Sequence, residues 1–489
     1  MKILLTTLNS KYIHSNLALK YIYTAAVGIC DSIEIKEFTI NNKDDYIFTD
    51  IIDGEYDIIC FSCYVWNIEG TVYLAENIKK AAPDTVIVLG GPETSFETDR
   101  FMEAHDFIDF IVMGEGEYTF NCLIRALLSG DAEYEKIKGL AYRDEGQVIL
   151  NQRADLLVLE SVPFPYKLLP CEGDKIVYYE SSRGCPFHCV YCMSSIERKT
   201  RALPVDRVFN EIGYFLGNNV KQVKFVDRTF NWDANRCKEI IKHIISRDNG
   251  MTNFHFEICG ELVDDDFIEL IKPVRDGLFQ FEVGIQSVNK KTLAAVKRST
   301  AVEKLLHYTG KLGEMKNIKL HTDLIAGLPF EDYNSFKESF NTTYKLKAGT
   351  FQLGFLKLLK GAPIREKAED YGYIYRKKAP YEIISNMFLS AKDVSRLKQM
   401  DEIINLYYNR GGFEKSLEYA TRTLADTPFD FYEEFSIYFG LKGFQNRSHK
   451  KSELYRILLE FAVWKCKKLK ISHEEFSAIL NGEMDGGGR

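Results

Sequence analysis

The stretch that decides the chemistry of this 489-residue chain is Ser182-Arg183-Gly184-Cys185-Pro186-Phe187-His188-Cys189-Val190-Tyr191-Cys192. Its three cysteines follow one another at intervals of four and three residues on a predicted loop. Thiolates are soft ligands that suit iron–sulfur clusters and zinc. The spacing therefore predicts a metal centre, and by spacing alone a structural zinc site is the alternative.

The segments around this loop alternate between predicted strands and predicted helices. The candidate strands span residues 176–180, 222–226, 253–258, 280–285, 317–325 and 350–355. Six such strands with helices between them are typical of a partial parallel barrel, in which functional residues gather at the carboxyl ends of the strands. We therefore predict a partial (β/α)6 barrel over residues 175–375.

The remaining parts of the chain have their own patterns. Residues 1–130 repeat strand–helix units whose glycine turns follow the strands, which predicts a Rossmann-like domain of the α/β class. Residues 131–174 hold several prolines and predict a linker with one small hairpin. Residues 376–489 predict a helical C-terminal domain, because apolar residues recur at helical spacing from Ile384 to Leu397.

Composition narrows the class of protein further. The hydrophobic fraction of 45% is that of a globular chain, and the net charge of −7 argues against nucleic acid as a partner. No apolar run reaches the length of a membrane-spanning helix, and no signal peptide is evident at the N-terminus. Eleven cysteines without an export signal suggest thiols or metal ligands in a cytoplasmic protein.

The cysteine stretch resembles the C-x3-C-x-aromatic-C motif of the radical S-adenosylmethionine (SAM) superfamily, with Tyr191 as the aromatic residue. The resemblance implies that Cys185, Cys189 and Cys192 hold a 4Fe-4S cluster whose open iron binds SAM. Reduction by an electron donor such as flavodoxin or ferredoxin would then cleave SAM to a 5′-deoxyadenosyl radical. We interpret His188 as a loop residue, since a fourth ligand would block the open iron.

Two later segments, 282–287 and 321–331, resemble the fourth-strand and fifth-strand motifs of the same superfamily. The resemblance implies that Glu282 and Gln286 lie near the methionine and adenosyl moieties of SAM. It further implies that Arg298 pairs with the SAM carboxylate and that Asp323 binds the ribose hydroxyls. The alternative is that the acids are barrel residues satisfied by neighbours and that Arg298 is a surface charge. No residue is assigned a catalytic role.

The N-terminal domain resembles the cobalamin-binding domain that precedes the barrel in many radical SAM enzymes. The resemblance is carried by residues 61–67, 89–93 and 113–117. It implies that cobalamin contacts come from Ser62, Gly90, Gly91, Gly114 and Glu115. The D-x-H-x-x-G motif of classical cobalamin domains is missing, and His14 is the histidine nearest to that position. The alternative is a domain that binds nothing and only packs on the barrel.

Three hypotheses of function follow from the resemblance. The first is cobalamin-dependent methyl transfer to an unactivated carbon by a radical SAM enzyme. The second is a radical rearrangement, cyclisation or oxidation without methyl transfer. The third is a cobalamin-binding or sensing protein with a vestigial cluster. The sequence names no substrate.

Overall fold

The computed structural model describes residues 1–30, 32–130, 133–197 and 199–486. The chain divides into two compact units. The first comprises Met1–Phe256, Leu358–Glu366 and Arg376–Tyr381, and the second comprises Glu257–Lys357, Lys367–Tyr375 and Glu382–Arg489. Residues 131–132 of the predicted linker and residues 487–489 of the predicted C-terminal domain lie outside the described residues.

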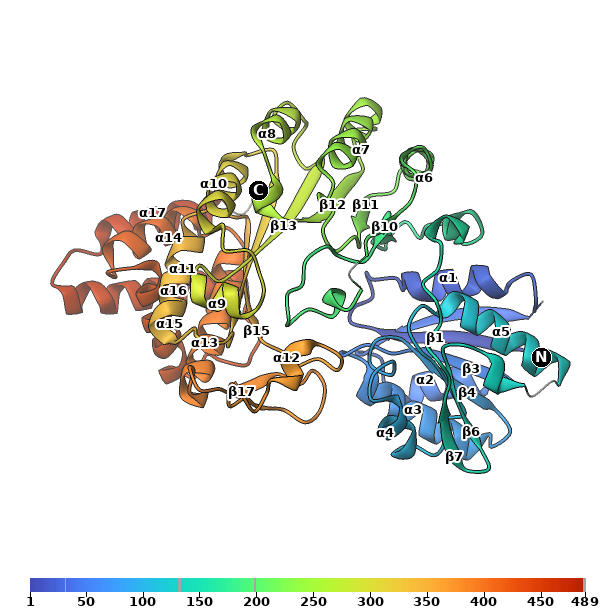
Figure 1. Cartoon of the computed structure of the whole chain (residues 1–489). Coiled ribbons are helices and arrows are strands. Elements are labelled where there is room, and N and C mark those ends of the chain that lie inside the picture. The colour runs from blue at the N-terminus through green and yellow to red at the C-terminus, as the bar shows by residue number, and fades with distance from the viewer. Residues whose placement is uncertain (31, 131–132, 198, 487–489) are drawn as a thin grey trace. The chain divides into compact units, whose positions relative to one another are not determined.

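The first unit opens with a sheet in the strand order β2-β1-β3-β4-β5-β6-β7, which Figure 1 shows between two layers of helices. Strands β1 to β5 are parallel, and the hairpin β6–β7 adds to β5 in the antiparallel sense. The elements are β1 (Ile3–Asn9), α1 (Leu17–Ala26), β2 (Ile33–Thr39), α2 (Asp44–Ile52), β3 (Ile58–Ser62), α3 (Ile68–Ala81), β4 (Val86–Gly90), α4 (Thr98–Glu103), β5 (Phe110–Val112), α5 (Gly116–Ser129), β6 (Leu140–Asp144) and β7 (Gln147–Leu150).

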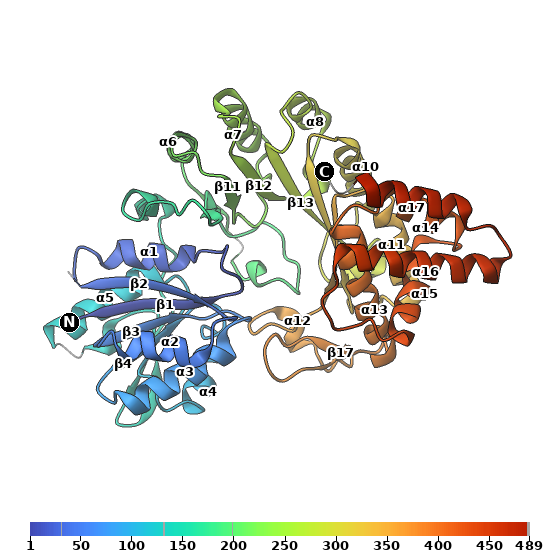
Figure 2. The same ribbon diagram turned by 180° about the vertical axis from the view of Figure 1, so that it is seen from behind.

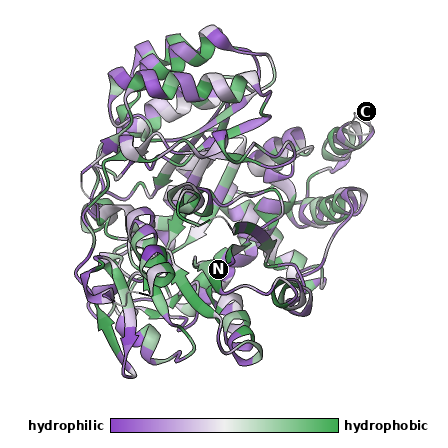
Figure 3. Cartoon of the chain, turned by 90° about the vertical axis from the view of Figure 1, so that its right-hand side faces the viewer, coloured by the Kyte–Doolittle hydropathy of each residue, from purple (hydrophilic) through white to green (hydrophobic). Residues whose placement is uncertain are grey.

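Each face of this sheet has its own hydrophobic core. Leu19 of α1 and Phe120 of α5 are buried in one core, and Ile47 of α2 and Ile78 of α3 are buried in the other. The second pair of helices faces the viewer in Figure 2. The helices show green and purple sides in Figure 3, as expected of amphipathic helices that bury one face. This covering of both faces is what a mostly parallel sheet requires.

The first unit continues with three parallel strands in the order β8-β11-β12. A short hairpin, β9–β10, spans the cysteine stretch. The elements are β8 (Val177–Tyr179), β9 (Ser182–Arg183), β10 (Arg201–Ala202), α6 (Val205–Gly217), β11 (Gln222–Phe225), α7 (Ala234–Arg247) and β12 (Asn253–Ile258). Helix α7 starts at an Asp233 side chain that accepts hydrogen bonds from two backbone N–H groups, the usual N-cap arrangement.

The second unit holds the parallel strands β13, β14 and β15. Buried and half-buried residues alternate along β13 and β14, so one face of these strands carries the polar side chains. The elements are α8 (Asp265–Ile271), β13 (Phe279–Gln286), α9 (Lys290–Ala295), α10 (Val302–Glu314), β14 (Lys319–Ala326), α11 (Tyr333–Tyr344) and β15 (Thr350–Phe355). All six predicted barrel strands are present, which confirms the predicted α/β class with parallel sheets.

The C-terminal region is helical only from residue 391. The elements after β15 are α12 (Pro363–Glu366), β16 (Ile374–Tyr375), β17 (Ile383–Ser385), α13 (Ala391–Ile403), a π-helix (Ile404–Asn409), α14 (Glu414–Thr423), α15 (Pro428–Leu441), α16 (Lys451–Leu469) and α17 (Glu474–Gly486). The prediction of helix around Ile384 was wrong, because that residue lies in β17. Ser390 forms a capping box with Asp393 and starts α13 there. Among the described helices, none is both long and apolar enough to cross a membrane.

Candidate functional site

The cysteine stretch forms a loop that leaves β9 and returns at β10. Cys185 and Cys189 are buried, Cys192 is half-buried, and none of the three forms a disulfide. The backbone N–H of Cys192 donates to the carbonyl of Cys189 at 3.0 Å. Gly184 has a φ of +87°, and a Cβ there would lie 2.5 Å from the carbonyl oxygen of Lys199. Only glycine can therefore begin this loop in its present path.

The donor set of the loop can be tested against an iron–sulfur cluster and against zinc. Among the residues that the structure describes, no group of three or more His, Cys, Asp or Glu side chains is arranged to hold a metal ion. A zinc ion needs its ligands around one point, whereas cluster cysteines bind different irons and can stand farther apart. Three thiols, two of them shielded from water, fit a cluster by their chemistry.

Four of the five predicted cobalamin contacts lie together at the carboxyl ends of the N-terminal strands. Ser62, Gly90, Gly91 and Gly114 line a cavity of about 110 Å³ whose walls come from α1 and α5. The Ser95 hydroxyl joins the two glycine turns, because it donates to the Gly91 carbonyl at 2.8 Å and accepts from the Gly114 N–H at 3.0 Å. The location agrees with the general rule for open parallel sheets.

Gly91 is the position in this cavity that requires glycine. Its φ is +110°, and a Cβ would lie 2.5 Å from the carbonyl oxygen of Cys63. Gly114 also has a positive φ, of +78°, and faces open space. The open space at Gly114 leaves its backbone accessible to a bound group.

The fifth predicted contact, Glu115, binds two arginines. Its Oε1 lies 3.0 Å from Nη1 of Arg183 and 2.5 Å from Nη2 of Arg201. Its Oε2 accepts a hydrogen bond from the Leu157 N–H at 2.8 Å. Burial alone would raise the pKa of Glu115, but the two arginines outweigh it and lower that pKa. The carboxylate of Glu115 is thus ionised and held by protein groups.

His14 lies on the loop after β1 and contacts β8. Its Nδ1 is 2.6 Å from the hydroxyl of Tyr178. Burial lowers the pKa of His14, and Lys11 and Lys224 add to this effect. The imidazole is therefore neutral at pH 7.

The predicted SAM contacts lie in the second unit. Glu282 on β13 pairs in register with His321 on β14, and Gly284 pairs with Asp323. Glu282 and Asp323 are half-buried, on the polar face of these strands. They therefore lie on adjacent strands.

Gln286 and Arg298 meet at Gly284. A guanidinium N–H of Arg298 donates to the Gly284 carbonyl. A Cβ on Gly284 would lie 2.2 Å from Nε2 of Gln286, so the glycine makes room for the amide. The buried Oε1 of Gln286 has no hydrogen-bond partner among the described residues. A buried amide oxygen without a partner is costly and marks a site where a ligand donor fits.

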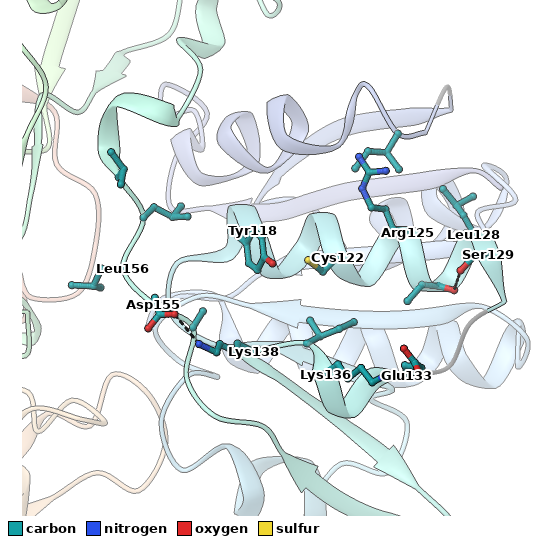
Figure 4. A pocket seen from close by; sticks show the side chains of 16 residues that line it. Tyr118, Cys122, Arg125, Leu128, Ser129, Glu133, Lys136, Lys138, Asp155 and Leu156 are labelled. Carbon is teal, nitrogen blue, oxygen red and sulfur yellow. Dashed lines mark hydrogen bonds and ion pairs between the residues drawn. The ribbon is translucent and has the colours of Figure 1, made fainter.

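A larger hollow in the first unit lies elsewhere. It is an open groove of about 1020 Å³ between α5 and residues 154–158, shown in Figure 4 with Tyr118 and Cys122 on its α5 wall. A Lys138–Asp155 ion pair of 2.8 Å spans the opposite side. None of the predicted site residues lines this groove. The size of a hollow is therefore no guide to the site in this protein.

Two arginines near the cysteines were missed as site residues by sequence analysis. Arg183 stands in the quoted motif two residues before Cys185, and Arg201 follows the loop. Each pairs with acids that lie 66 to 86 residues earlier in the chain. The arginine in the motif was visible in the sequence, but its partners were not.

Comparisons with known proteins match these parts to families. Residues 3–124 match the B12 binding domain, residues 179–342 match the radical SAM superfamily, and residues 369–482 match a family of proteins of unknown function, DUF4080. Both matches to known domains cover the parts that carry the geometry described above.

Relatives and a solved structure resemble this chain over much of its length. The cobalamin-dependent radical SAM methyltransferase TokK of Streptomyces tokunonensis is 27% identical over 66% of this chain and 50% of its own length. The 2-(S-pantetheinyl)-carbapenam-3-carboxylate methyltransferase of Streptantibioticus cattleyicolor is 25% identical over 79% of this chain and 62% of its own length. The chain thus spans about half to three fifths of these relatives.

The solved structure of the cobalamin-dependent SAM radical enzyme OxsB with aqua-cobalamin bound has the same fold. It superposes with a TM-score of 0.67 over 99% of this chain and 78% of its own, at 17% identity. With both matches in chain order, the chain carries a B12-binding domain over residues 3–124 followed by a domain of the radical SAM superfamily over residues 179–342.

Proposed function

We propose that the protein is a radical SAM enzyme that uses cobalamin to transfer a methyl group to an unactivated carbon. The observation that carries the proposal is the loop of three cysteines, none of them in a disulfide, after the first strand of the radical SAM domain. The B12-binding domain that precedes it supports the cobalamin part. The names of the two curated relatives, both methyltransferases, support the reaction.

Different residues of the chain would bind the cluster, cobalamin and SAM. Cys185, Cys189 and Cys192 would hold the cluster. When bound, the cluster supplies the electron that cleaves SAM to a 5′-deoxyadenosyl radical, and cobalamin carries the methyl group. In the N-terminal domain, Ser62, Gly90, Gly91 and Gly114 would take the cobalamin tail in the cavity at the strand ends.

The polar face of β13 and β14 would take SAM. The guanidinium of Arg298 suits the SAM carboxylate, since a planar fork binds a carboxylate through two N–H groups. Asp323 would accept from the ribose hydroxyls, and Glu282 would lie near the amino group. The unpartnered Oε1 of Gln286 would accept from a donor on the ligand.

The proposal includes an external reductant and a reducing compartment. Cleavage of SAM needs one electron per turnover, so a flavodoxin or ferredoxin is the expected partner. No disulfide joins any of the described cysteines, which supports a reducing compartment such as the cytoplasm.

The test is anaerobic purification and reconstitution, followed by metal analysis and a SAM cleavage assay. We expect about four irons per chain, cobalt in equal amount to protein, and release of 5′-deoxyadenosine. Cys189→Ala should lose the iron and the cleavage, while Cys171→Ala on the linker should keep both. Wild-type protein without iron would overturn the enzyme proposal. A product whose mass lacks an added methyl group would favour rearrangement or oxidation.

A further inference from the structure

The cysteine loop begins at a buried arginine that three carboxylates surround. Arg183 contacts Glu117 at 2.6 Å, Glu180 at 2.8 Å and Glu115 at 3.0 Å. Its side chain is 11% exposed, and its guanidinium lies over the ring of Tyr21. We call Arg183, Arg201, Glu115, Glu117 and Glu180 the arginine clamp.

The clamp joins the cysteine loop to the B12-binding domain. Glu115 is the N-cap residue of α5 and Glu117 lies in the first turn of that helix, whereas Arg183 is two residues from Cys185. Arg201, at the other end of the loop, binds the same Glu115 at 2.5 Å. One carboxylate of the B12-binding domain thus holds both ends of the cysteine loop.

The pKa values of the charged groups in the clamp depend on their neighbours in the clamp. Burial alone would lower the pKa of Arg183, but Glu180, Glu117 and Glu115 together raise it. Burial raises the pKa of Glu180 to about 7, against the opposing effect of Arg183. Removal of one partner from such a buried network leaves uncompensated charge, so the remaining groups must move or be hydrated.

A second connection reaches the middle of the same loop. The Ile364 N–H donates at 2.9 Å to the carbonyl of Val190, which lies between Cys189 and Cys192. One residue on, Arg365 pairs with Glu97 of the B12-binding domain at 3.2 Å. Residues 358–366 therefore form a strap between this domain and the cysteine loop.

The same strap is anchored by a buried ion pair. Lys360 is 8% exposed, and its Nζ lies 4.0 Å from a carboxylate oxygen of Glu93 and 3.3 Å from the Glu93 carbonyl. Tyr381 donates to the same carboxylate at 2.7 Å. Glu93 follows the Gly90-Gly91 turn, so the strap and the proposed cobalamin cavity share one loop.

We propose that the B12-binding domain sets the conformation of the cysteine loop, with Glu115, Glu117 and Arg183 as positioning residues for the iron–sulfur cluster. This rests on the proposed function for the nature of the group that the cysteines hold. Glu115 and Glu117 then act on the cluster from another domain, through Arg183, and neither binds a cofactor.

The first experiment needs neither iron nor cobalamin. Apo-protein of the wild type, Arg183→Gln and the double variant Glu115→Gln/Glu117→Gln is alkylated with iodoacetamide, and labelling of each cysteine is followed by peptide mass spectrometry. Cys185 and Cys189 should react several-fold faster in both variants, because the loop loses its anchor. Glu103→Gln, an exposed carboxylate of the same domain, is the matched control and should react like the wild type.

Cys60 serves as the internal reference, because it is buried in a strand core away from the loop. Equal acceleration at Cys60 would mean general unfolding and would overturn the positioning role. Unchanged rates at Cys185 and Cys189 would overturn it too. Arg183→Lys keeps the positive charge but loses the planar guanidinium that contacts three carboxylates. Its cysteine alkylation rates should therefore lie between those of the wild type and those of Arg183→Gln.

The second experiment measures iron after reconstitution. The clamp variants should bind iron about tenfold more weakly than the wild type, which is the usual effect of losing a group that orients ligands. If the wild type and the clamp variants bind iron equally well, the positioning role of the clamp is overturned and the proposed function is not. Wild type without iron would overturn the proposed function, while the alkylation result would still decide whether the clamp positions the loop.

Discussion

The hydroxyl of Tyr178 on β8 lies 2.6 Å from Nδ1 of His14, the histidine nearest to the position of the cobalt-binding histidine in classical cobalamin domains. Burial raises the pKa of Tyr178 to about 12, so the phenol is protonated at neutral pH. Its hydrogen bond with Nδ1 ties the imidazole of His14 to β8.

His14→Gln should therefore leave the cobalt coordination unchanged. We expect the visible absorption spectrum of bound hydroxocobalamin to be the same in wild type and variant. Tyr178→Phe is the companion variant, since it frees Nδ1 without removing the ring. A change of spectrum in His14→Gln would show that His14 binds the metal after all.

Gly91→Ala should destabilise the N-terminal domain and weaken cobalamin binding. A Cβ there meets the Cys63 carbonyl oxygen at 2.5 Å, at a φ of +110° that side chains rarely adopt. We expect a loss of about 2 kcal/mol in the free energy of unfolding, measured by denaturant titration. Gly28→Ala, where nothing lies within 4 Å, is the control and should stay within about 0.5 kcal/mol of the wild type.

Gln286→Met should lower the affinity for SAM while the fold keeps its stability. The buried Oε1 of Gln286 has no partner among the described residues, so replacing the amide by an apolar chain of similar shape removes an unsatisfied group. Titration calorimetry of the reconstituted protein should show weaker SAM binding, beside an unchanged thermal midpoint. A large drop in that midpoint with intact binding would assign Gln286 to packing.

The stability of the second unit should fall as pH rises because of Glu331. Burial raises the pKa of this carboxyl from 4.5 to about 7, although Ser287 and Ser339 donate to it at 2.6 and 2.7 Å. Between those two pH values the unfolded chain releases the proton and the folded chain keeps it. The contribution is therefore fully present below about pH 4.5 and lost by about pH 7.

Glu331→Gln should remove this pH dependence. At pH 8 the variant should be more stable than the wild type by at most about 3 kcal/mol, since its amide stays neutral and still accepts from the serines. The measurement is the thermal midpoint of both proteins from pH 5 to pH 8. Parallel curves for the two proteins would contradict a raised pKa at Glu331.

The order of the strands could be predicted from the sequence, but the exact ends of some strands could not. The predicted strands 253–258 and 350–355 match β12 and β15 in full, because their alternation is clear and turns bound them. Apolar residues run from Tyr56 to Trp66, but β3 takes up only Ile58–Ser62 of this run. Asn67 accepts from the Tyr64 N–H at 2.7 Å and turns the chain into α3, which an apolar pattern does not reveal.

The sequence by itself determined the cysteine motif, the strand–helix order and the glycines at the strand ends, because each depends on residues close together in the chain. The tertiary structure alone decided what Glu115 contacts and how the cysteine loop is anchored. Apart from Glu180, which is three residues from Arg183, the partners in the clamp and the strap are between 66 and 288 residues apart. Pairings of charged side chains over such distances follow from how the strands are ordered in space, and no spacing rule in the sequence specifies them.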